Sequence, residues 1–324
     1  MSVLVRAHPS RRSGTIRTWG AAMTLAVVAS ACGNPTGGEV SLEPHTAPGQ
    51  PAGTMLLATG TDFAAIVQRV QEAISETGGS VTTVVDHAAD ARAAGVAIPP
   101  STLVIGGSPA AQLPLLRIDQ RAGADLPQRY LVRQGSDGSV SLTVDSADYV
   151  AAVAGVSDPG ARNALRDSTA AVLGEAVPGT PVPVPSPLVG VTPSNYLLTV
   201  VGSASVPTTV DRLRRGADRR PTRSVATVDL AAGSADPGPA IRPTSVVLAS
   251  DAQAEAPLLA AAPSIGLDLP LRFVVWLDDQ NRTQIGHPDV RRIAARHGVA
   301  VDDPNIAQLA ADADRLSRLA AGIA

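Results

Sequence analysis

Two hydrophobic periods alternate along residues 54–177 and predict a mixed domain of helices and strands. A short apolar strand at Met55–Ala58 precedes a segment from Phe63 to Ile74, whose apolar residues recur at helical spacing. Further strands are expected at Val81–Val85, Thr102–Ile105, Arg129–Arg133 and Ser139–Val144, and further helices from Asp148 onward and over Ala161–Val177. The predicted order is therefore β-α-β-β-β-β-α.

Residues 194–324 show the same order of apolar periods. A helix is expected near Pro207–Gly216 and a last helix over Asn305–Ala324. Strands are expected at Ser224–Val228, Ser245–Leu248, Arg272–Leu277 and Thr283–Ile285. The predicted fold class is α+β, with two copies of an antiparallel-rich sheet that helices cover on one face.

The two segments also repeat each other residue by residue. Asp86 matches Asp229, Pro100 matches Pro243, Pro114 matches Pro257, and Asp125-Leu126-Pro127 returns as Asp268-Leu269-Pro270, each at a shift of 143 positions. A constant shift over such a length indicates a tandem duplication of a whole domain rather than a short solenoid repeat. We therefore expect repeat domains at 54–177 and 194–324.

Two stretches without an apolar period separate these domains from the rest. Residues 32–53 are polar and rich in Gly and Pro, which predicts a flexible tether. Residues 178–193 carry alternating prolines, which favour an extended and semi-rigid linker. Binding of this linker by a polyproline-recognition module is the alternative interpretation.

Residues 1–31 have the pattern of an export signal. Four arginines precede the uncharged run Gly20–Ala31, which as a helix spans about 18 Å and is too short to cross a bilayer stably. Small residues then lead to Cys32, as in a bacterial lipobox, although Ala29 stands where Leu is preferred. We expect lipidation of Cys32, with palmitate among the acyl groups. The alternative is a cysteine that happens to end a conventional signal, and a twin-arginine signal is rejected because Gly14 and Thr15 replace apolar residues.

Charge and cysteine content narrow the function classes. Removing residues 1–31, which hold four Arg and no Asp or Glu, changes the formal net charge from −3 to −7. A negative surface argues against a nucleic-acid partner. The expected location is the extracytoplasmic face of the cell membrane, held there by lipid. The single cysteine excludes an internal disulfide or a multi-cysteine metal site within this chain.

Several local strings carry a family resemblance. A helix start at Thr61-Asp62-Phe63, then Val85-Asp86-His87-Ala88, Gly95, Gly107-Ser108-Pro109 and Asp125-Leu126-Pro127 resemble the domain of unknown function 302 family. The resemblance covers residues 55–175 and, more weakly, 195–324. It implies a TATA-binding-protein-like β-α-β4-α fold that is dimeric when single, and it implies no activity. Ser108 replaces the usual Asn, and the second copy departs at Leu230 and at Ser250-Asp251-Ala252.

Four residues of the first copy are candidates for ligand binding or catalysis. His87 follows a predicted strand beside Asp86, a carboxylate that could orient the imidazole as a base or ligand. Asp125 and its copy Asp268 precede Leu-Pro at a strand entrance, where a role as a turn or cap is the alternative. Gly107 lies in a glycine-rich turn that could approach a ligand closely or serve only as a turn.

No metal or cofactor motif accompanies these residues. His287 and His297 lack the spacing of a ligand pair, and no Gly-x-Ser-x-Gly elbow occurs. Three hypotheses remain. The preferred one is a membrane-tethered, non-enzymatic binding or assembly protein whose two domains associate as an intramolecular pseudo-dimer, with no external partner identified. The others are an enzyme that uses His87 and Asp86, and a carrier of a small molecule or metal.

Overall fold

The fold was obtained as a computed structural model, which describes residues 50–194, 196–232 and 239–323. The predicted signal at 1–31, Cys32 and most of the predicted tether lie outside the described residues. Within the described part of the chain, no helix combines the length and apolar character needed to cross a membrane.

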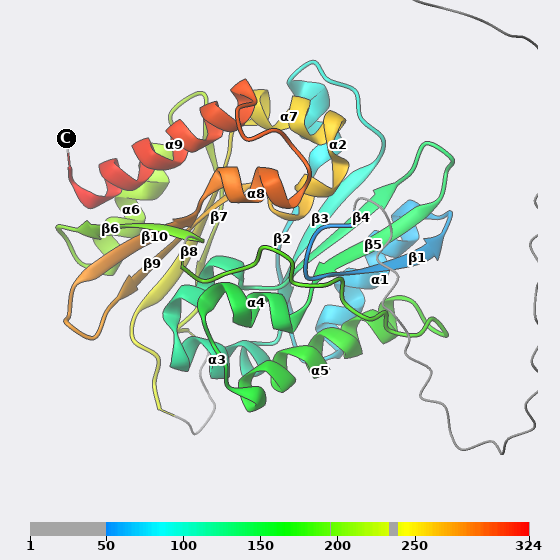
Figure 1. The fold of residues 1–324 in the computed structure, drawn as a ribbon, viewed down its shortest axis with the longest axis horizontal. Coiled ribbons are helices and arrows are strands. Elements are labelled where there is room, and N and C mark those ends of the chain that lie inside the picture. Colours follow the sequence, from blue (N-terminus) through cyan, green and yellow to red (C-terminus); the bar gives the residue numbers. More distant parts are fainter. Residues whose placement is uncertain (1–49, 195, 233–238, 324) are drawn as a thin grey trace, which may run out of the picture. The chain divides into compact units, whose positions relative to one another are not determined.

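The first repeat contains a five-stranded antiparallel sheet with strand order β1-β5-β4-β3-β2 (Figure 1). In chain order its elements are β1 (Thr54–Gly60), α1 (Phe63–Glu76), β2 (Ser80–Asp86), α2 (His87–Ala93), β3 (Ser101–Gly107), α3 (Pro109–Ile118), the 3₁₀ helix η1 (Gln120–Asp125), β4 (Arg129–Gln134), β5 (Val140–Asp145), α4 (Ala147–Ala154) and α5 (Pro159–Ala176).

The second repeat has the same topology, with strand order β6-β10-β9-β8-β7. Its elements are β6 (Leu197–Gly202), α6 (Val206–Ala217), β7 (Arg223–Asp229), β8 (Thr244–Ser250), α7 (Ala252–Ala261), the 3₁₀ helix η2 (Pro263–Leu267), β9 (Leu271–Leu277), β10 (Thr283–Pro288), α8 (Val290–Arg296) and α9 (Pro304–Ala321). The predicted α+β class and its duplication are therefore confirmed.

The structure adds short helices that hydrophobic periodicity did not predict, notably α2, α3 and η1. Each begins at a polar cap: Asp86 accepts a hydrogen bond from the Ala89 N–H, and Ser108 precedes a proline at the first position of α3. The expected turn at residues 106–109 is thus the junction between β3 and α3. Hydrophobic periodicity did not reveal these helices because each is only one to three turns long.

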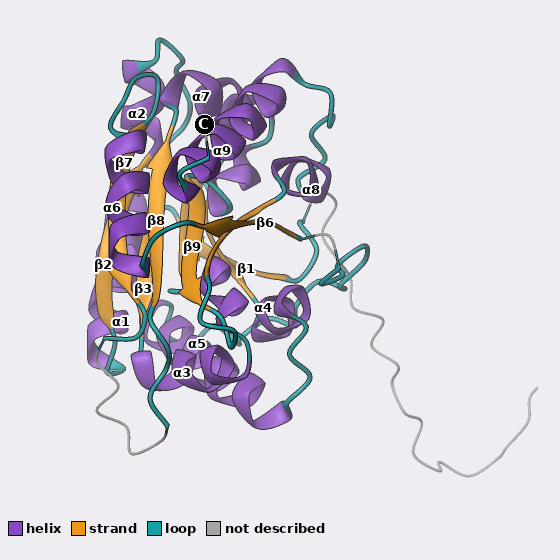
Figure 2. Ribbon diagram, turned by 90° about the vertical axis from the view of Figure 1, so that its left-hand side faces the viewer, coloured by secondary structure: helices purple, strands orange, loops and turns teal. Residues whose placement is uncertain are grey.

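One face of each sheet is covered by helices of its own repeat. On the sheet face that points away from the other repeat, Val104 and Tyr130 of the first sheet share a buried core with α1 and α5. On the equivalent face of the second sheet, Val247 and Phe273 share a buried core with α6 and α9. Figure 2 shows α1 beside β2 and β3, and α6 beside β7 and β8. Strand residues of opposite parity therefore point to the other face of each sheet.

Those opposite faces contribute to a third core, which the two repeats share. Leu103, Ile105 and Leu131 of the first sheet lie in one buried cluster with Val246 and Val274 of the second. The 3₁₀ helix of each repeat packs on the sheet of the other repeat: η1 contacts β8 and β9, and η2 contacts β3 and β4. The two repeats accordingly contact each other through equivalent elements.

The described end of the tether and the linker also pack on the first repeat. The Gly53 N–H donates to the Ser186 carbonyl (3.2 Å), and the Ser186 N–H donates to the Thr54 carbonyl (2.8 Å). The side chain of Ser186 is buried and its hydroxyl donates to the Pro51 carbonyl (2.6 Å). This part of the linker is an extended segment held against the start of β1.

Candidate functional site

Three aspartates and three arginines meet between the two repeats and form a buried group, here named the inter-repeat cluster. Its members are Asp125, Arg129 and Asp145 from the first repeat and Asp268, Arg272 and Arg296 from the second. Charged side chains are seldom buried unless they are paired. The contacts among these six side chains therefore compensate the cost of burying their charges.

The duplicated Asp-Leu-Pro strings supply half of the cluster. In each repeat the aspartate lies at the end of the 3₁₀ helix, and an arginine four residues later lies at the start of the following strand. Asp125 accepts from Arg129 Nη2 at 2.8 Å, and Asp268 accepts from Arg272 Nη2 at 2.9 Å. Both arginines have the strand parity of the shared core, so both point into the interface.

Further bonds connect one repeat to the other. Arg272 Nη2 donates to Asp125 Oδ1 at 2.8 Å, and Arg272 Nε donates to the Ala124 carbonyl at 2.6 Å. In the opposite direction, Arg129 Nη1 lies 3.4 Å from Asp268 Oδ1. Each duplicated ion pair is thus completed by its counterpart in the other repeat.

Arg296 and Asp145 make the cluster asymmetric. Arg296 Nη2 donates to Asp145 Oδ1 at 2.5 Å, and Arg296 Nη1 donates to Asp268 Oδ2 at 2.8 Å. At the shift of 143, the counterparts of these two residues are Val153 and Pro288, which carry no charge. The second repeat therefore provides Arg296, which has no charged counterpart in the first repeat. The first repeat provides Asp145, which has no charged counterpart in the second.

The cluster is electrically balanced, because three guanidinium groups face three carboxylates. Burial alone would raise the pKa of Asp268, but Arg296 and Arg272 outweigh it and hold that pKa well below its usual range. Burial lowers the pKa of His297, whose Nε2 lies 2.7 Å from Asp268 Oδ2, so this imidazole is neutral and donates a hydrogen bond. Charge balance of this kind allows ions to remain buried.

Carboxylate oxygens of Asp125, Asp145 and Asp268 lie within 4.8 Å of one another, a spacing that could hold a metal ion. The three arginines already bond to five of the six carboxylate oxygens and leave Asp125 Oδ2 without a hydrogen-bond partner, so a divalent cation would have to displace arginines to bind all three aspartates. The donor set therefore fits a structural ion cluster better than a metal site.

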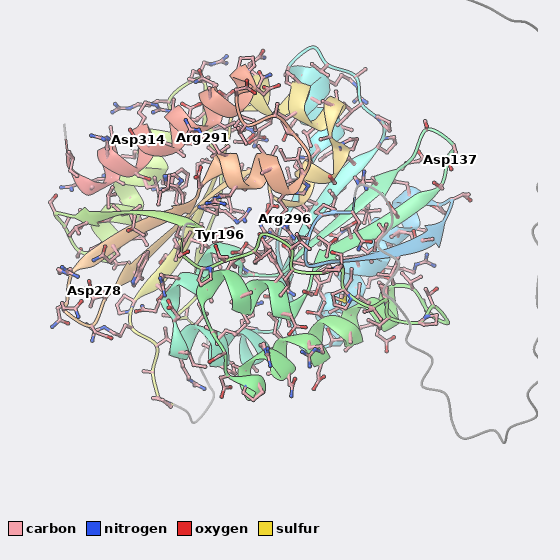
Figure 3. The ribbon with its side chains drawn as sticks, viewed as in Figure 1. Asp137, Tyr196, Asp278, Arg291, Arg296 and Asp314 are labelled. Carbon is pink, nitrogen blue, oxygen red and sulfur yellow. The ribbon has the colours of Figure 1, made fainter. Side chains whose placement is uncertain are left out.

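A cavity of about 260 Å³ adjoins the inter-repeat cluster. Its wall is formed by residues 52, 149, 153, 189–192, 196, 292, 293, 295 and 296, which come from both repeats and from the linker. Tyr149 and Tyr196 meet edge to face, with ring centroids 6.3 Å apart, and the Arg296 guanidinium lies 3.7 Å from the Tyr149 ring centroid. Tyr196 and Arg296, which are labelled in Figure 3, both line this cavity.

Polar groups of the cavity wall bond mainly to the protein. The Tyr196 hydroxyl donates to Asp125 Oδ1 at 2.7 Å, and all three nitrogens of the Arg296 guanidinium donate to the Ala52 carbonyl, Asp145 or Asp268. The rest of the wall is largely aliphatic, with Val153 and Ile293 among its side chains. The cavity is thus mainly apolar, and part of its wall is formed by the rings of Tyr149 and Tyr196 and the guanidinium of Arg296.

His87 and Asp86 do not form a catalytic pair in the structure. Asp86 caps α2, while the His87 ring is fully buried and its Nε2 lies 2.9 Å from the Gly266 carbonyl of the other repeat. Burial lowers the pKa of His87, so the neutral ring donates this bond. His87 does not line the cavity beside the cluster, and its geometry indicates a role in contact between the repeats.

The other two candidates of the first repeat are separated from each other. Gly107 ends β3, and a Cβ atom there would lie 2.6 Å from Gln112 Nε2, so the close approach at this glycine is to a protein side chain. Asp125 is buried and bonds to Arg129, Arg272 and Tyr196 rather than capping a turn. Of the four candidates, Asp125 alone lies in the inter-repeat cluster.

Sequence reasoning missed most of the cluster. Arg129 and Arg272 obey the same shift of 143 as the aspartates before them, so extending the repeated string by two residues would have found both. No such signal exists for Asp145 or Arg296, because their counterparts are different residue types. Tyr196 lies at the end of the linker, where no periodic pattern draws attention to it.

Two homologous α+β domains that share a core and an ion cluster define a tandem-repeat protein. The family model described as "Domain of unknown function DUF302" matches residues 56–176 and 198–321, which is more than half of the chain. The chain therefore belongs to this family, and the predicted tandem arrangement is confirmed.

Curated relatives share only part of the chain. Over 100 residues the chain is 33% identical to the fluoride-specific ion channel FluC 1 of Brucella suis biovar 1 (strain 1330), which covers 31% of this chain and 39% of that protein. It is also 33% identical to FluC 1 of Brucella abortus biovar 1 (strain 9-941), covering 37% of that protein. The chain thus spans well under half the length of these relatives.

Among solved structures, an uncharacterized conserved DUF302 protein from Bacillus stearothermophilus is similar at 20% identity. The match covers 39% of this chain and 96% of that chain, with a TM-score of 0.33.

Proposed function

We propose that this protein is an exported, lipid-anchored binding module in which the two DUF302 domains act as one intramolecular pseudo-dimer. The observation that carries the proposal is the cavity beside the inter-repeat cluster, because its wall combines residues of both repeats and the linker. Neither repeat alone contains the complete wall. Binding at this cavity therefore requires the tandem arrangement.

The wall also indicates the class of ligand. Its aliphatic residues and two aromatic edges favour a small, largely apolar molecule. The guanidinium of Arg296 is already bonded on all three nitrogens, so it contributes its flat face and charge rather than free donors. The absence of a catalytic pair at His87 favours binding over catalysis.

Lipid anchoring belongs to the same proposal and is supported by the sequence pattern up to Cys32. Mass spectrometry of the amino-terminal peptide from native envelopes tests it. We expect an acylated Cys32, and we expect Cys32→Ala to release the protein from the membrane fraction. An unmodified Cys32 in the native protein contradicts the anchor and leaves the cavity proposal intact.

Native mass spectrometry of the full protein, purified from its own envelope, tests the cavity. We expect a small co-purifying mass in the wild type. The change Ala295→Trp fills the cavity from an exposed position of α8, so it should remove this mass without unfolding the protein. Ala171→Trp, at an exposed position of α5 outside the cavity wall, is the matched control and should retain it. A wild type without additional mass, or retention in Ala295→Trp, contradicts the proposal.

A further inference from the structure

Helices α6 and α9 of the second repeat lie side by side, and their outer side carries an excess of arginine (Figure 1). This surface, together with the turn that follows α6, is named here the α6–α9 face. Its charged members are the arginines at 212, 214, 215, 219, 220, 315 and 318 and the aspartates at 211, 218, 312 and 314. Seven arginines against four aspartates give the face a formal charge of +3, whereas the whole chain has a formal net charge of −3.

Several arginines of the α6–α9 face are not neutralised by the protein. Within the part of the chain that the structure describes, the side chains of Arg215, Arg219 and Arg220 make no ion pair or hydrogen bond. Arg214 lies 3.7 Å from Asp211, and both side chains are about half-exposed. An exposed ion pair of this kind binds weakly, so these guanidinium groups remain available to an external anion.

An exposed leucine lies among the arginines. Leu319 of α9 packs on Gly216 of α6 and is 37% exposed. On α6, Arg212 lies one helical turn before this glycine. On α9, Arg315 lies one turn before the leucine and donates to Thr222 Oγ1 at 3.3 Å, in the turn that follows α6. Arginines of both helices therefore flank an apolar side chain.

The first repeat provides a matched comparison, because buried positions fix the correspondence of the helices. Four buried positions of α1 recur in α6 at a shift of 143: residues 66, 70, 73 and 74 match residues 209, 213, 216 and 217. Four buried positions of α5 recur in α9 at a shift of 144: residues 165, 169, 172 and 176 match residues 309, 313, 316 and 320. The outward positions between them can therefore be matched one by one.

At the matched positions the first repeat has no excess of positive charge. The counterparts of the seven arginines are Arg69, Gln71, Glu72, Glu76, Thr77, Ala171 and Gly174. The counterparts of the four aspartates are uncharged: Gln68, Ser75, Ser168 and Ala170. One arginine against two glutamates gives this face a formal charge of −1, and Glu175 stands where the second repeat has Leu319. The positive charge and the exposed leucine therefore belong to the second repeat alone.

This combination of side chains is suited to an anionic bilayer. Clusters of about four to eight basic residues are typical of surfaces that contact anionic headgroups. Arginines can remain at the level of the headgroups while an apolar side chain between them enters the interfacial layer. The lipid anchor proposed above would keep a bilayer close to the protein, and the choice of a bilayer over an acidic protein rests on that proposal.

We propose that the α6–α9 face of the second repeat docks on an anionic phospholipid bilayer. Its arginines contact the phosphate groups of the headgroups, and Leu319 enters the interface. This contact adds to the anchor and orients the protein, because the equivalent face of the first repeat has the opposite charge. The α6–α9 face shares no residue with the wall of the inter-repeat cavity.

The test is co-sedimentation of residues 33–324 with lipid vesicles. This chain keeps every described residue but lacks the predicted signal and Cys32. We expect partitioning onto phosphatidylcholine vesicles that contain phosphatidylglycerol to exceed partitioning onto pure phosphatidylcholine by about tenfold or more. Raising the salt concentration from about 0.05 M to about 0.5 M should remove most of this preference, because salt screens contacts between exposed charges.

Introducing first-repeat residues into the face should remove the preference. The triple variant Arg214→Gln/Arg215→Glu/Arg219→Glu carries the residues of the matched positions, and we expect its partitioning to fall by about tenfold or more. Leu319→Glu introduces the matched Glu175 and should reduce partitioning by about threefold or more, because no leucine enters the interface. All four positions are exposed, so both variants should keep the wild-type circular dichroism spectrum.

A charge-matched control separates the face from the net charge of the protein. Arg121→Gln/Arg166→Glu/Arg282→Glu makes the same change in net charge at exposed arginines outside the face, and it should change partitioning by no more than about twofold. Equal partitioning of the wild type onto both vesicles, an unaffected triple variant or an equal loss in the control would each overturn the proposal.

Two further outcomes are distinguished by the same experiment. Binding of soluble polyglutamate more tightly than vesicles would assign the α6–α9 face to an acidic protein and overturn the proposal. The protein tested has no acyl group, so failure of the anchor appears in the mass spectrum of native Cys32, and failure of the face appears in the vesicle measurement.

Discussion

His87 and Leu230 occupy equivalent positions in the two repeats, and each contacts the glycine of the other repeat's 3₁₀ helix. The Nε2 atom of His87 lies 2.9 Å from the Gly266 carbonyl, and a Cβ atom on Gly123 would lie 2.9 Å from Leu230 Cδ1. Gly123 and Gly266 are themselves related by the shift of 143. The interface therefore contains two equivalent contacts to a glycine of a 3₁₀ helix. The polar side chain of His87 makes one of them, and the apolar side chain of Leu230 makes the other.

Replacing Gly123 by valine should loosen this interface. The new side chain would overlap Leu230 and also Val274, where the Cβ already lies 3.1 Å from Cγ2. Overpacking of this kind lowers the free energy of unfolding by about 1–3 kcal/mol. Urea unfolding followed by far-UV circular dichroism measures the loss. Gly174→Val, in open space on α5, should change it by less than about 1 kcal/mol, and an equal loss at both sites would refute the explanation.

Arg272→Met should be strongly destabilising. It removes the guanidinium that bonds Asp125, Asp268 and the Ala124 carbonyl, and it leaves two carboxylates with less compensation. Breaking a buried ion pair from one side lowers the free energy of unfolding by about 3–5 kcal/mol. The matched change Arg282→Met breaks an exposed pair with Asp278 and should have an effect below about 1 kcal/mol in the same urea titration. Comparable losses in the two variants would show that the inter-repeat cluster contributes little.

Glu255→Gln should stabilise the protein at neutral and alkaline pH. Burial raises the pKa of Glu255 to about 7, and its Oε1 atom is buried without a hydrogen-bond partner. Its counterpart in the first repeat is Gln112, which is also buried. The wild-type carboxyl is therefore protonated in the folded protein at low pH, and ionisation disfavours the fold as the pH rises.

The pH window for this effect follows from the two pKa values. The wild type keeps its full stability below about pH 4, where the carboxyl is protonated in both states, and loses it progressively up to about pH 7. Glu255→Gln should match the wild type at pH 4 and exceed it by about 3 kcal/mol at pH 8. Urea unfolding at both pH values measures the difference. A constant difference between the two would contradict a titrating Glu255.

His87→Leu should reduce the loss of stability in acid. Burial depresses the pKa of His87 in the folded protein, so the unfolded chain binds a proton first as the pH falls below the ordinary histidine value. The wild type therefore loses stability on acidification, and the leucine variant removes one of the titrating groups. Urea unfolding at pH 7.5 and pH 5 should give a smaller difference for the variant.

His87→Leu carries a separate effect at neutral pH. Leucine leaves the Gly266 carbonyl without its donor, which lowers the free energy of unfolding by about 1–3 kcal/mol. Leucine does occur at the equivalent position of the second repeat, where Leu230 faces Gly123. An unchanged pH dependence in a folded His87→Leu protein would mean that the pKa of His87 is the same in the folded and unfolded chain, which would contradict its depression by burial.

Hydrophobic periodicity predicted the strands and the long helices because each of these elements buries one side over enough residues for its apolar period to repeat. Phe63–Glu76 and Pro304–Ala321 are amphipathic over their whole length, and both were expected within a few residues. The helix at His87 has seven residues, and the strand before it ends at Asp86, so the period changes too quickly to be detected. Cap residues were the available signal there.

Prediction of the candidate site was more limited for a different reason. A repeat reveals residues that both copies keep, and Asp125 and Asp268 were identified on that basis. The inter-repeat cavity depends on Arg296 and Tyr196, which the first copy does not have. Differences between copies become informative only when the structure shows which positions correspond in space.

The bonds of Ala52 determine where mechanical tension would enter this protein. A pull on the chain ahead of Gln50 would reach the Pro51 carbonyl, which accepts from Ser186 of the linker, and then the Ala52 carbonyl, which accepts hydrogen bonds from two nitrogens of Arg296. Traction from an amino-terminal anchor would thus pass into α8 of the second repeat before it could peel β1 from its sheet. The second repeat, although it lies farther along the chain, would share this force, and both repeats would resist the unfolding of β1 together.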